Sequence, residues 1–142
     1  MPVDRFGITP PRFVDVGGDG VLDLVLGSYH ADVAGVVDAG AVYHWDGGSS
    51  LVGAPPPVRT FAVPGAHAQD WLGRGGPRSI LLRDVTTDGI PEIIVGSPFV
   101  DYGGVHDTGA MFLWDGTASG PAPAPSVDLA VPGAAPGDTL GY

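Results

Sequence analysis

The sequence predicts an all-β protein made of two four-stranded antiparallel sheets, and three observations support this. The 142 residues include 24 glycines and 15 prolines, which stand between short apolar runs rich in Val, Leu and Ile. This pattern is typical of many short strands joined by turns. An internal repeat divides these runs into two equal groups, and no helical periodicity of 3.6 residues competes with them.

The repeat is visible when the chain is shifted by 69 residues. Residues 15–47 then align with residues 84–116 without a gap, and 15 of the 33 aligned positions are identical. A second marker, D-x-(apolar)-G, begins at Asp4, Asp70 and Asp138, which are 66 and 68 residues apart. We therefore expect one repeat over 1–69 and another over 70–137. Residues 138–142 are expected to begin a third repeat, with a strand that a neighbouring chain could share.

Each repeat is expected to contain four strands, at 12–16, 22–27, 40–45 and 58–63 and at 79–84, 91–96, 109–114 and 126–131. The second strand of each repeat is apolar on both alternating faces, as strands buried on both sides are. The two sheets should therefore pack face to face, as neighbouring blades of a β-propeller do. Trp45 and Trp114 occupy the same repeat position and are expected to pack in the core or between the sheets.

An acidic loop joins the first and second strands of each repeat. The loops read DVGGDGVLD and DVTTDGIPE, with carboxylates at positions 1, 5 and 9 and Gly at position 6. Ca²⁺ binds six to eight oxygen ligands, and a Gly allows the sharp turn that wraps a loop around the ion. Position 7 would contribute its backbone carbonyl. The predicted calcium ligands are Asp15, Gly17, Asp19, Val21 and Asp23 in the first loop and Asp84, Thr86, Asp88, Ile90 and Glu92 in the second.

Position 3 of the loops departs from the usual pattern of Asp or Asn. Gly17 has no side chain, so a water or a backbone oxygen would replace it, and Thr86 would offer its hydroxyl. Fewer charged ligands weaken a calcium site, which predicts about millimolar affinity, with the first loop as the stronger candidate. The alternative is a plain hairpin turn built on Asp-Gly, which needs no metal.

These motifs, in this order, resemble the FG-GAP repeat of integrin α-subunits and many bacterial surface proteins. Phe6-Gly7 matches the FG element, whereas Leu72 and Leu140 replace its Phe. The other matching segments are Gly27-Ser28-Tyr29, Gly96-Ser97-Pro98, Gly40-Ala41-Val42-Tyr43 and Gly109-Ala110-Met111-Phe112. The resemblance implies an integrin-type FG-GAP β-propeller with two four-stranded blades per chain. It also implies an extracellular or cell-surface location, binding of a protein or glycan as in cell adhesion, and calcium loops opposite the ligand face.

Two blades do not complete a propeller, because closed propellers have about four to eight. The bare faces and open edges of two blades favour association. Either the chain belongs to a longer propeller, or three or four copies close a ring through head-to-tail contacts. We therefore expect a homo-oligomer or other propeller repeats as partners.

The loops 28–38 and 97–107 are a second candidate for binding. Their aromatic and histidine residues would form a ligand-binding rim: Tyr29, His30, Phe99, Tyr102 and His106. The alternative is that the Asp residues of these loops cap turns by accepting local backbone N–H groups. The four histidines lack the spacing of zinc ligands, and His44 is expected to pack within its strand.

Composition and missing motifs exclude several classes of function. The net charge of −10 repels nucleic acid and acidic membranes. The chain has no cysteine for a disulfide, and no apolar run long enough for membrane insertion. Nucleophile elbows, phosphate loops and HExxH helices are absent. The sequence therefore predicts a non-catalytic, calcium-supported binding module. The alternative is a structural self-assembly unit, or a fragment of a larger propeller, without its own ligand.

Overall fold

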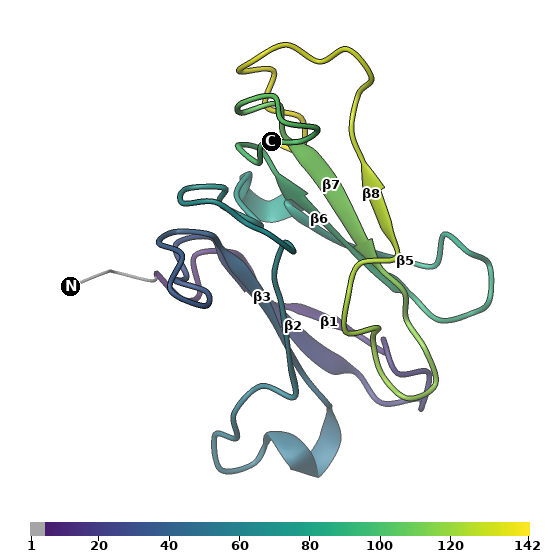
Figure 1. Ribbon diagram of the computed structural model, residues 1–142. Coiled ribbons are helices and arrows are strands. Elements are labelled where there is room, and N and C mark those ends of the chain that lie inside the picture. The colour runs from purple at the N-terminus through teal and green to yellow at the C-terminus, as the bar shows by residue number, and fades with distance from the viewer. Residues whose placement is uncertain (1–4) are drawn as a thin grey trace.

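The computed structural model describes residues 5–142 and contains two four-stranded antiparallel sheets (Figure 1). The first sheet has the order β1 (Arg12–Val14), β2 (Asp23–Ser28), β3 (Ala41–Trp45) and β4 (Arg59–Phe61). The second has the order β5 (Ile80–Arg83), β6 (Glu92–Ser97), β7 (Ala110–Trp114) and β8 (Val127–Leu129). Two short 3-10 helices, η1 (Gly48–Leu51) and η2 (Gly76–Arg78), lie in loops. The prediction of an all-β protein with two such sheets is confirmed.

The two sheets share one strand register, as the repeat requires. Leu24 lies opposite Trp45 in the first sheet, and Ile93 lies opposite Trp114 in the second. Both pairs differ by the same 69 positions. The correspondence changes by one residue at the last strand, because the loop before it covers residues 46–58 in the first repeat and 115–126 in the second. Thus Leu129, opposite Met111, takes the place of Phe61, opposite Val42.

Alternation along the strands gives each sheet two faces, which we call face A and face B. Face A of the first sheet carries Phe13, Leu24, Leu26, Tyr43 and Trp45, and face B carries Val14, Val25, Val42, His44 and Phe61. Face A of the second sheet carries Leu82, Ile93, Val95, Phe112 and Trp114, and face B carries Leu81, Ile94, Met111, Leu113 and Leu129. All four faces are mainly apolar.

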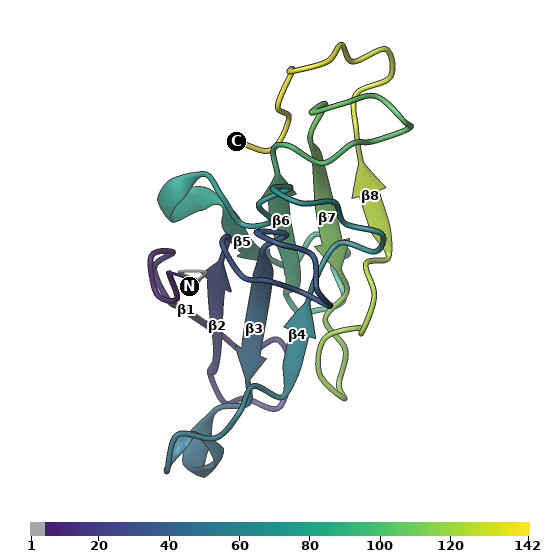
Figure 2. The same ribbon diagram turned by 60° about the vertical axis from the view of Figure 1, so that its left-hand side comes forward.

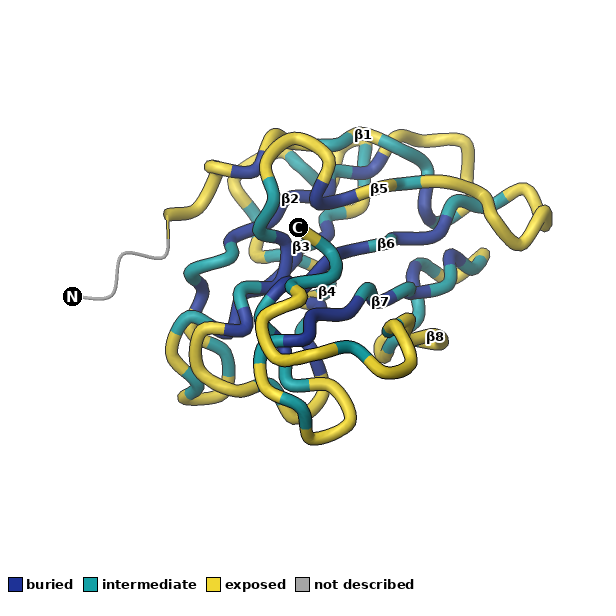
Figure 3. Tube along the Cα trace, turned by 90° about the horizontal axis from the view of Figure 1, so that it is seen from above, coloured by how far each residue is buried: buried dark blue, intermediate teal, exposed yellow. Residues whose placement is uncertain are grey.

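The core lies between face B of the first sheet and face A of the second, a contact that we call the internal joint. The rings of Phe61 and Trp114 meet there with their centroids 5.5 Å apart, and both side chains are buried. Val25, Val42 and Ile93 are fully buried in the same cluster. Figure 2 shows the first sheet in front of the second, and Figure 3 shows buried residues along the strands with exposed loops around them. The predicted face-to-face packing is confirmed.

The D-x-(apolar)-G segment at Asp70–Gly73 crosses the internal joint. The backbone N–H of Leu72 donates to Ala39 in the first repeat (3.0 Å), and that of Gly73 donates to Gly96 in the second (2.8 Å). Gly40 has φ +83°, and a Cβ at this position would lie 2.4 Å from the Leu72 nitrogen. Glycine is therefore required where this segment passes over the first sheet.

The two other copies of this segment lie at the outer faces. Asp4 of the first copy lies outside the described residues, but Phe6 of that copy packs against Tyr43 and Trp45 on face A. In the last copy, Leu140 forms a parallel bridge with Gly109 beside the second sheet. Within residues 5–142, no helix has the length and apolar character of a membrane span.

Candidate metal sites and loop pocket

In the first acidic loop, the carboxylates bond to the backbone of the loop itself. Asp15 accepts the N–H groups of Asp19 (3.0 Å) and Gly20 (2.7 Å), and Asp19 accepts that of Val21 (2.8 Å). Such Asx bonds stabilise a tight turn without any ion. Asp15 and Asp19 belong to no group of three convergent metal-binding side chains in the described part of the chain.

Asp23, at position 9 of this loop, is buried and closes the turn from the strand side. Its two carboxylate oxygens accept the N–H groups of Val16 (3.0 Å) and Gly47 (2.9 Å). Gly17 lies beside it, and a Cβ built on Gly17 would be 3.9 Å from Asp23 Oδ2. The carboxylate of Asp23 converges with two residues of the next strand and loop, His44 and Asp46.

The second loop brings its acids together. One oxygen each of Asp84, Asp88 and Glu92 lies within 4.8 Å of the other two. Glu92 is fully buried and accepts the N–H of Val85 (2.6 Å) and the Thr86 hydroxyl (3.0 Å). Asp88 also accepts the N–H of Ile90 (2.8 Å). Asp23 accepts the equivalent N–H of Val16, but the longer side chain of Glu92 also brings an oxygen near those of Asp84 and Asp88. The sequence ranked the first loop higher, whereas the convergent carboxylates lie in the second.

A second group of possible metal ligands lies at the end of the β2–β3 pair. His44 Nε2 is 3.6 Å from Asp23 Oδ2 and 3.7 Å from Asp46 Oδ1. His44 is fully buried, and neither ring nitrogen has a hydrogen-bond partner among the described residues. The expectation that His44 packs within its strand is correct, but it missed this cluster. The register could have revealed it, because Asp23 and Asp46 flank the opposed pair Leu24 and Trp45, and His44 shares a face with Asp46.

A cavity of about 210 Å³ adjoins this group. Asp19, Asp23 and Asp46 line it from the first repeat, together with the Arg59 guanidinium. The loop 118–120 of the second repeat forms the opposite wall, and Arg59 donates a hydrogen bond to the Ser119 carbonyl there (3.1 Å). Three carboxylates and one guanidinium leave a net charge of about −2 around the cavity, which favours a divalent cation.

The loops 28–38 and 97–107 fit the turn-capping alternative. Asp32 accepts the N–H of Asp38 (3.0 Å), and Asp101 accepts that of Asp107 (2.9 Å). His106 also lies near Asp101 and Asp107, at 3.2 and 3.1 Å, but it is 76% exposed. These acids therefore have a structural role in both repeats, independent of any ligand.

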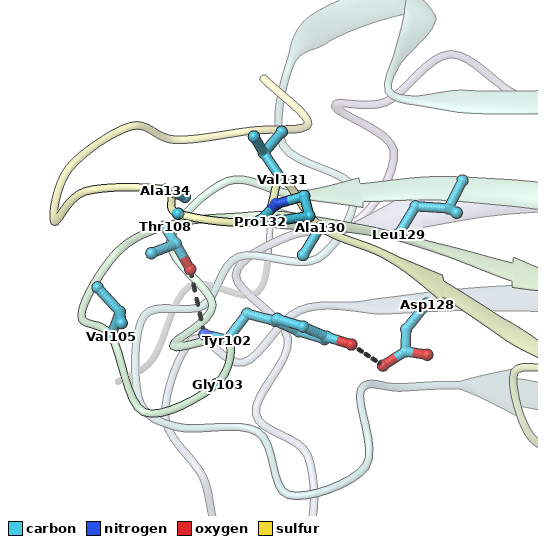
Figure 4. A pocket seen from close by; sticks show the side chains of 11 residues that line it. Tyr102, Gly103, Val105, Thr108, Asp128, Leu129, Ala130, Val131, Pro132 and Ala134 are labelled. Carbon is cyan, nitrogen blue, oxygen red and sulfur yellow. Dashed lines mark hydrogen bonds between the residues drawn. The ribbon is translucent and has the colours of Figure 1, made fainter.

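A cavity of about 460 Å³ lies between the second of these loops and the segment after β8 (Figure 4). Tyr102 crosses it and donates its hydroxyl to Asp128 (2.7 Å). This hydrogen bond raises the pKa of the Tyr102 phenol. Of the predicted rim residues, only Tyr102 lines the cavity, whereas Tyr29 and His30 stack on one another in the first repeat (4.4 Å between centroids). Tyr29, His30 and Phe99 instead gather around Trp71, with ring centroids 5.9 Å apart for His30 and Trp71 and 5.0 Å apart for Trp71 and Phe99. Three of the predicted rim residues therefore lie together, but outside the lining of this cavity.

No family model matches the chain, and no curated protein sequence matches it either. The resemblance to FG-GAP repeats therefore depends on the motifs of the chain itself.

Proposed function

We propose that the chain is a pair of β-propeller blades that joins further blades through its two outer faces and acts as a non-catalytic interaction module. The observation that supports this proposal is that both outer faces are apolar and partly exposed. On face A of the first sheet Phe13 is 60% exposed, and on face B of the second Leu129 is 52% exposed. Soluble proteins seldom leave two such sheet faces without a partner.

The internal joint is a template for the contact that these outer faces would make. It pairs a face B with a face A, and the two outer faces are also one B and one A. Leu129 stands in the place of Phe61, and Trp45 stands in the place of Trp114. If a second copy docks head to tail, Leu129 of one copy meets Trp45 of the other as Phe61 meets Trp114. A contact of this kind is heterologous and can close into a ring.

Three or four copies would supply six or eight blades, within the range of known propellers. Blades from a longer chain or from other propeller repeats would present the same kind of faces. In either case the proposed role of this chain is to supply two adjacent blades of a ring.

Calcium is part of the proposal at the second acidic loop. The converging oxygens of Asp84, Asp88 and Glu92 support it, since hard cations prefer carboxylates. An ion there would fix the turn between β5 and β6, and would leave the outer faces free for other blades.

The test is the mass of the purified chain in solution, measured by light scattering with calcium present. The proposal expects a discrete trimer or tetramer. Phe13→Glu places a charge on one outer face and Leu129→Glu on the other, so each variant alone should be a monomer. Mixed in equal amounts, the two variants should form a dimer and nothing larger, because one intact A face and one intact B face remain.

A wild-type chain that stays monomeric at high concentration would refute assembly from copies of this chain. Dimers formed by either variant alone would refute a head-to-tail contact.

A further inference from the structure

The buried imidazole of His44 needs an explanation that blade packing does not provide. A buried polar group without a hydrogen-bond partner destabilises a protein, and such groups are rare. Neither nitrogen of His44 has such a partner within residues 5–142, and Nε2 faces two carboxylate oxygens at 3.6 and 3.7 Å. These distances are too long for hydrogen bonds. They leave room for an ion between the three atoms.

We propose that Asp23, His44 and Asp46 bind a divalent transition metal, with Zn²⁺ as the ion that fits best. Zn²⁺ binds histidine nitrogen and carboxylate oxygen at about 2.0–2.2 Å in tetrahedral geometry, which separates ligand atoms by about 3.3–3.6 Å. The separations of 3.6 and 3.7 Å from His44 Nε2 require shifts of only a few tenths of an ångström. The three side chains supply three ligands, and the adjoining cavity has room for a water as the fourth.

The protein already holds one ligand in place. Both oxygens of Asp23 accept backbone N–H groups, from Val16 and Gly47, which fixes the carboxylate. Hydrogen bonds of this kind orient the ligands of metal sites. His44 comes from β3, a central strand of its sheet. Asp46 has a side chain that is 57% exposed, so an ion can enter from that side.

This site differs from the predicted calcium loops in chemistry and in position. Calcium prefers oxygen ligands, whereas imidazole favours zinc and other transition metals. Asp15 and Asp19 contribute nothing to the three-residue group. The second repeat has Glu92, Leu113 and Asp115 at the corresponding positions, so it lacks the imidazole. The inference is independent of ring assembly, because all three ligands belong to one repeat.

The experiment is a calorimetric titration of the chelator-treated full chain with Zn²⁺, together with the absorption spectrum of the Co²⁺ form. His44→Leu copies the second repeat, which accommodates Leu113 at the same strand position. Asp46→Asn changes an exposed ligand and should leave the fold intact. His106→Gln is the matched control, because it removes an exposed histidine beside two other acids.

We expect one tight Zn²⁺ site in the wild type and in His106→Gln, with a Co²⁺ spectrum typical of tetrahedral coordination. Affinity should fall at least about tenfold in both His44→Leu and Asp46→Asn, since loss of even an outer-shell partner has effects of that size. If the wild type binds no Zn²⁺ or binds it no more tightly than Asp46→Asn, the proposal is wrong, and His44 is simply an ion-pair partner of Asp23. Loss of binding in His106→Gln would place the ion at the exposed group of Asp101, His106 and Asp107 instead.

Discussion

The segments Asp70–Gly73 and Asp138–Gly141 have the same local structure but different surroundings. Leu72 donates its N–H to Ala39 (3.0 Å), and Leu140 donates to Thr108 (2.9 Å). Asp70 accepts the N–H of the residue three positions before it at 2.7 Å, and Asp138 does the same. Yet Asp70 and Leu72 are buried, at 1% and 0% exposure, whereas Asp138 is exposed and Leu140 is only partly buried.

The difference shows what the next sheet contributes. Both copies form the turn and the bond from the leucine N–H to the preceding repeat, whereas the bond from Gly73 to Gly96 uses the following sheet. Burial comes from the sheet on the other side, which exists at the internal joint, whereas residues 5–142 place no sheet beyond the second one. The last segment therefore has the local structure of the internal joint without the burial that a following sheet provides. Three comparisons of matched variants can test this interpretation.

The largest expected change in the free energy of unfolding comes from shortening the buried side chain of Leu72. Leu72→Ala should lower the free energy of unfolding by about 2–5 kcal/mol, because it removes a core side chain and leaves a cavity. Leu140→Ala should lower it by about 1 kcal/mol or less in the isolated chain, since Leu140 is partly exposed. Urea denaturation at low protein concentration measures both values. Equal losses in the two variants would contradict the difference in burial.

Calcium binding should raise the stability of the chain by a smaller amount. The rise should depend on the second acidic loop, whose carboxylates converge. If calcium is at about ten times its dissociation constant, binding should raise the melting temperature by about 3–6 °C. Asp88→Asn should abolish this rise, whereas Asp19→Asn should preserve it, because Asp19 lies in the loop whose acids do not converge. Thermal melting with calcium and with excess chelator provides the measurement. A rise that depends on Asp19 and survives Asp88→Asn would assign the ion to the first loop.

The smallest expected effect concerns the pH dependence of stability. Burial raises the pKa of Asp70 above its ordinary value of 3.8, while the N–H of His67 partly opposes this. Between 3.8 and the raised pKa, the folded chain binds more protons than the unfolded chain. Stability therefore falls as pH rises through that interval and stays at the lower level above it.

Asp70→Asn should remove this fall, since the amide oxygen can still accept the His67 N–H and does not titrate. Asp138→Asn is the matched control, because Asp138 accepts the equivalent N–H of Ala135 in the exposed copy. Chemical denaturation at a series of pH values from about 3.5 to 7 compares the three proteins. If both variants changed the profile alike, burial at the joint would not be the cause.

Much of the architecture followed from patterns along the chain. All eight strands lie within two residues of their predicted ends, and the 69-residue repeat reproduces the cross-strand register of Leu24 with Trp45 in Ile93 with Trp114. The apolar character of both faces of the second strands also predicted that they would be buried on both sides. The internal joint, where Phe61 packs on Trp114, covers only one face of each sheet.

The candidate sites were less predictable, because they depend on which side chains converge. The spacing of carboxylates is the same in both acidic loops, but Asp23 turns toward His44 while Glu92 reaches Asp84 and Asp88. Two differences decide which acids converge. Glu92 is one methylene longer than Asp23, and the neighbouring strand carries His44 in the first repeat but Leu113 in the second. Trp45, which was expected in the core or between the sheets, instead lies on the outer face A, where it packs against Phe6 and Tyr43 and donates its indole N–H to Pro55 (3.0 Å).

By itself, then, the sequence determined the number of strands, their approximate ends, their division into two repeats and the apolar character of both faces of the second strand in each. These features depend on local turns and on periodicity along the chain. Only the tertiary structure decided which acids meet and which of two similar faces is covered. Those outcomes depend on how far each side chain extends and on which sheet lies beside it. Both depend on contacts between residues that are far apart in the chain.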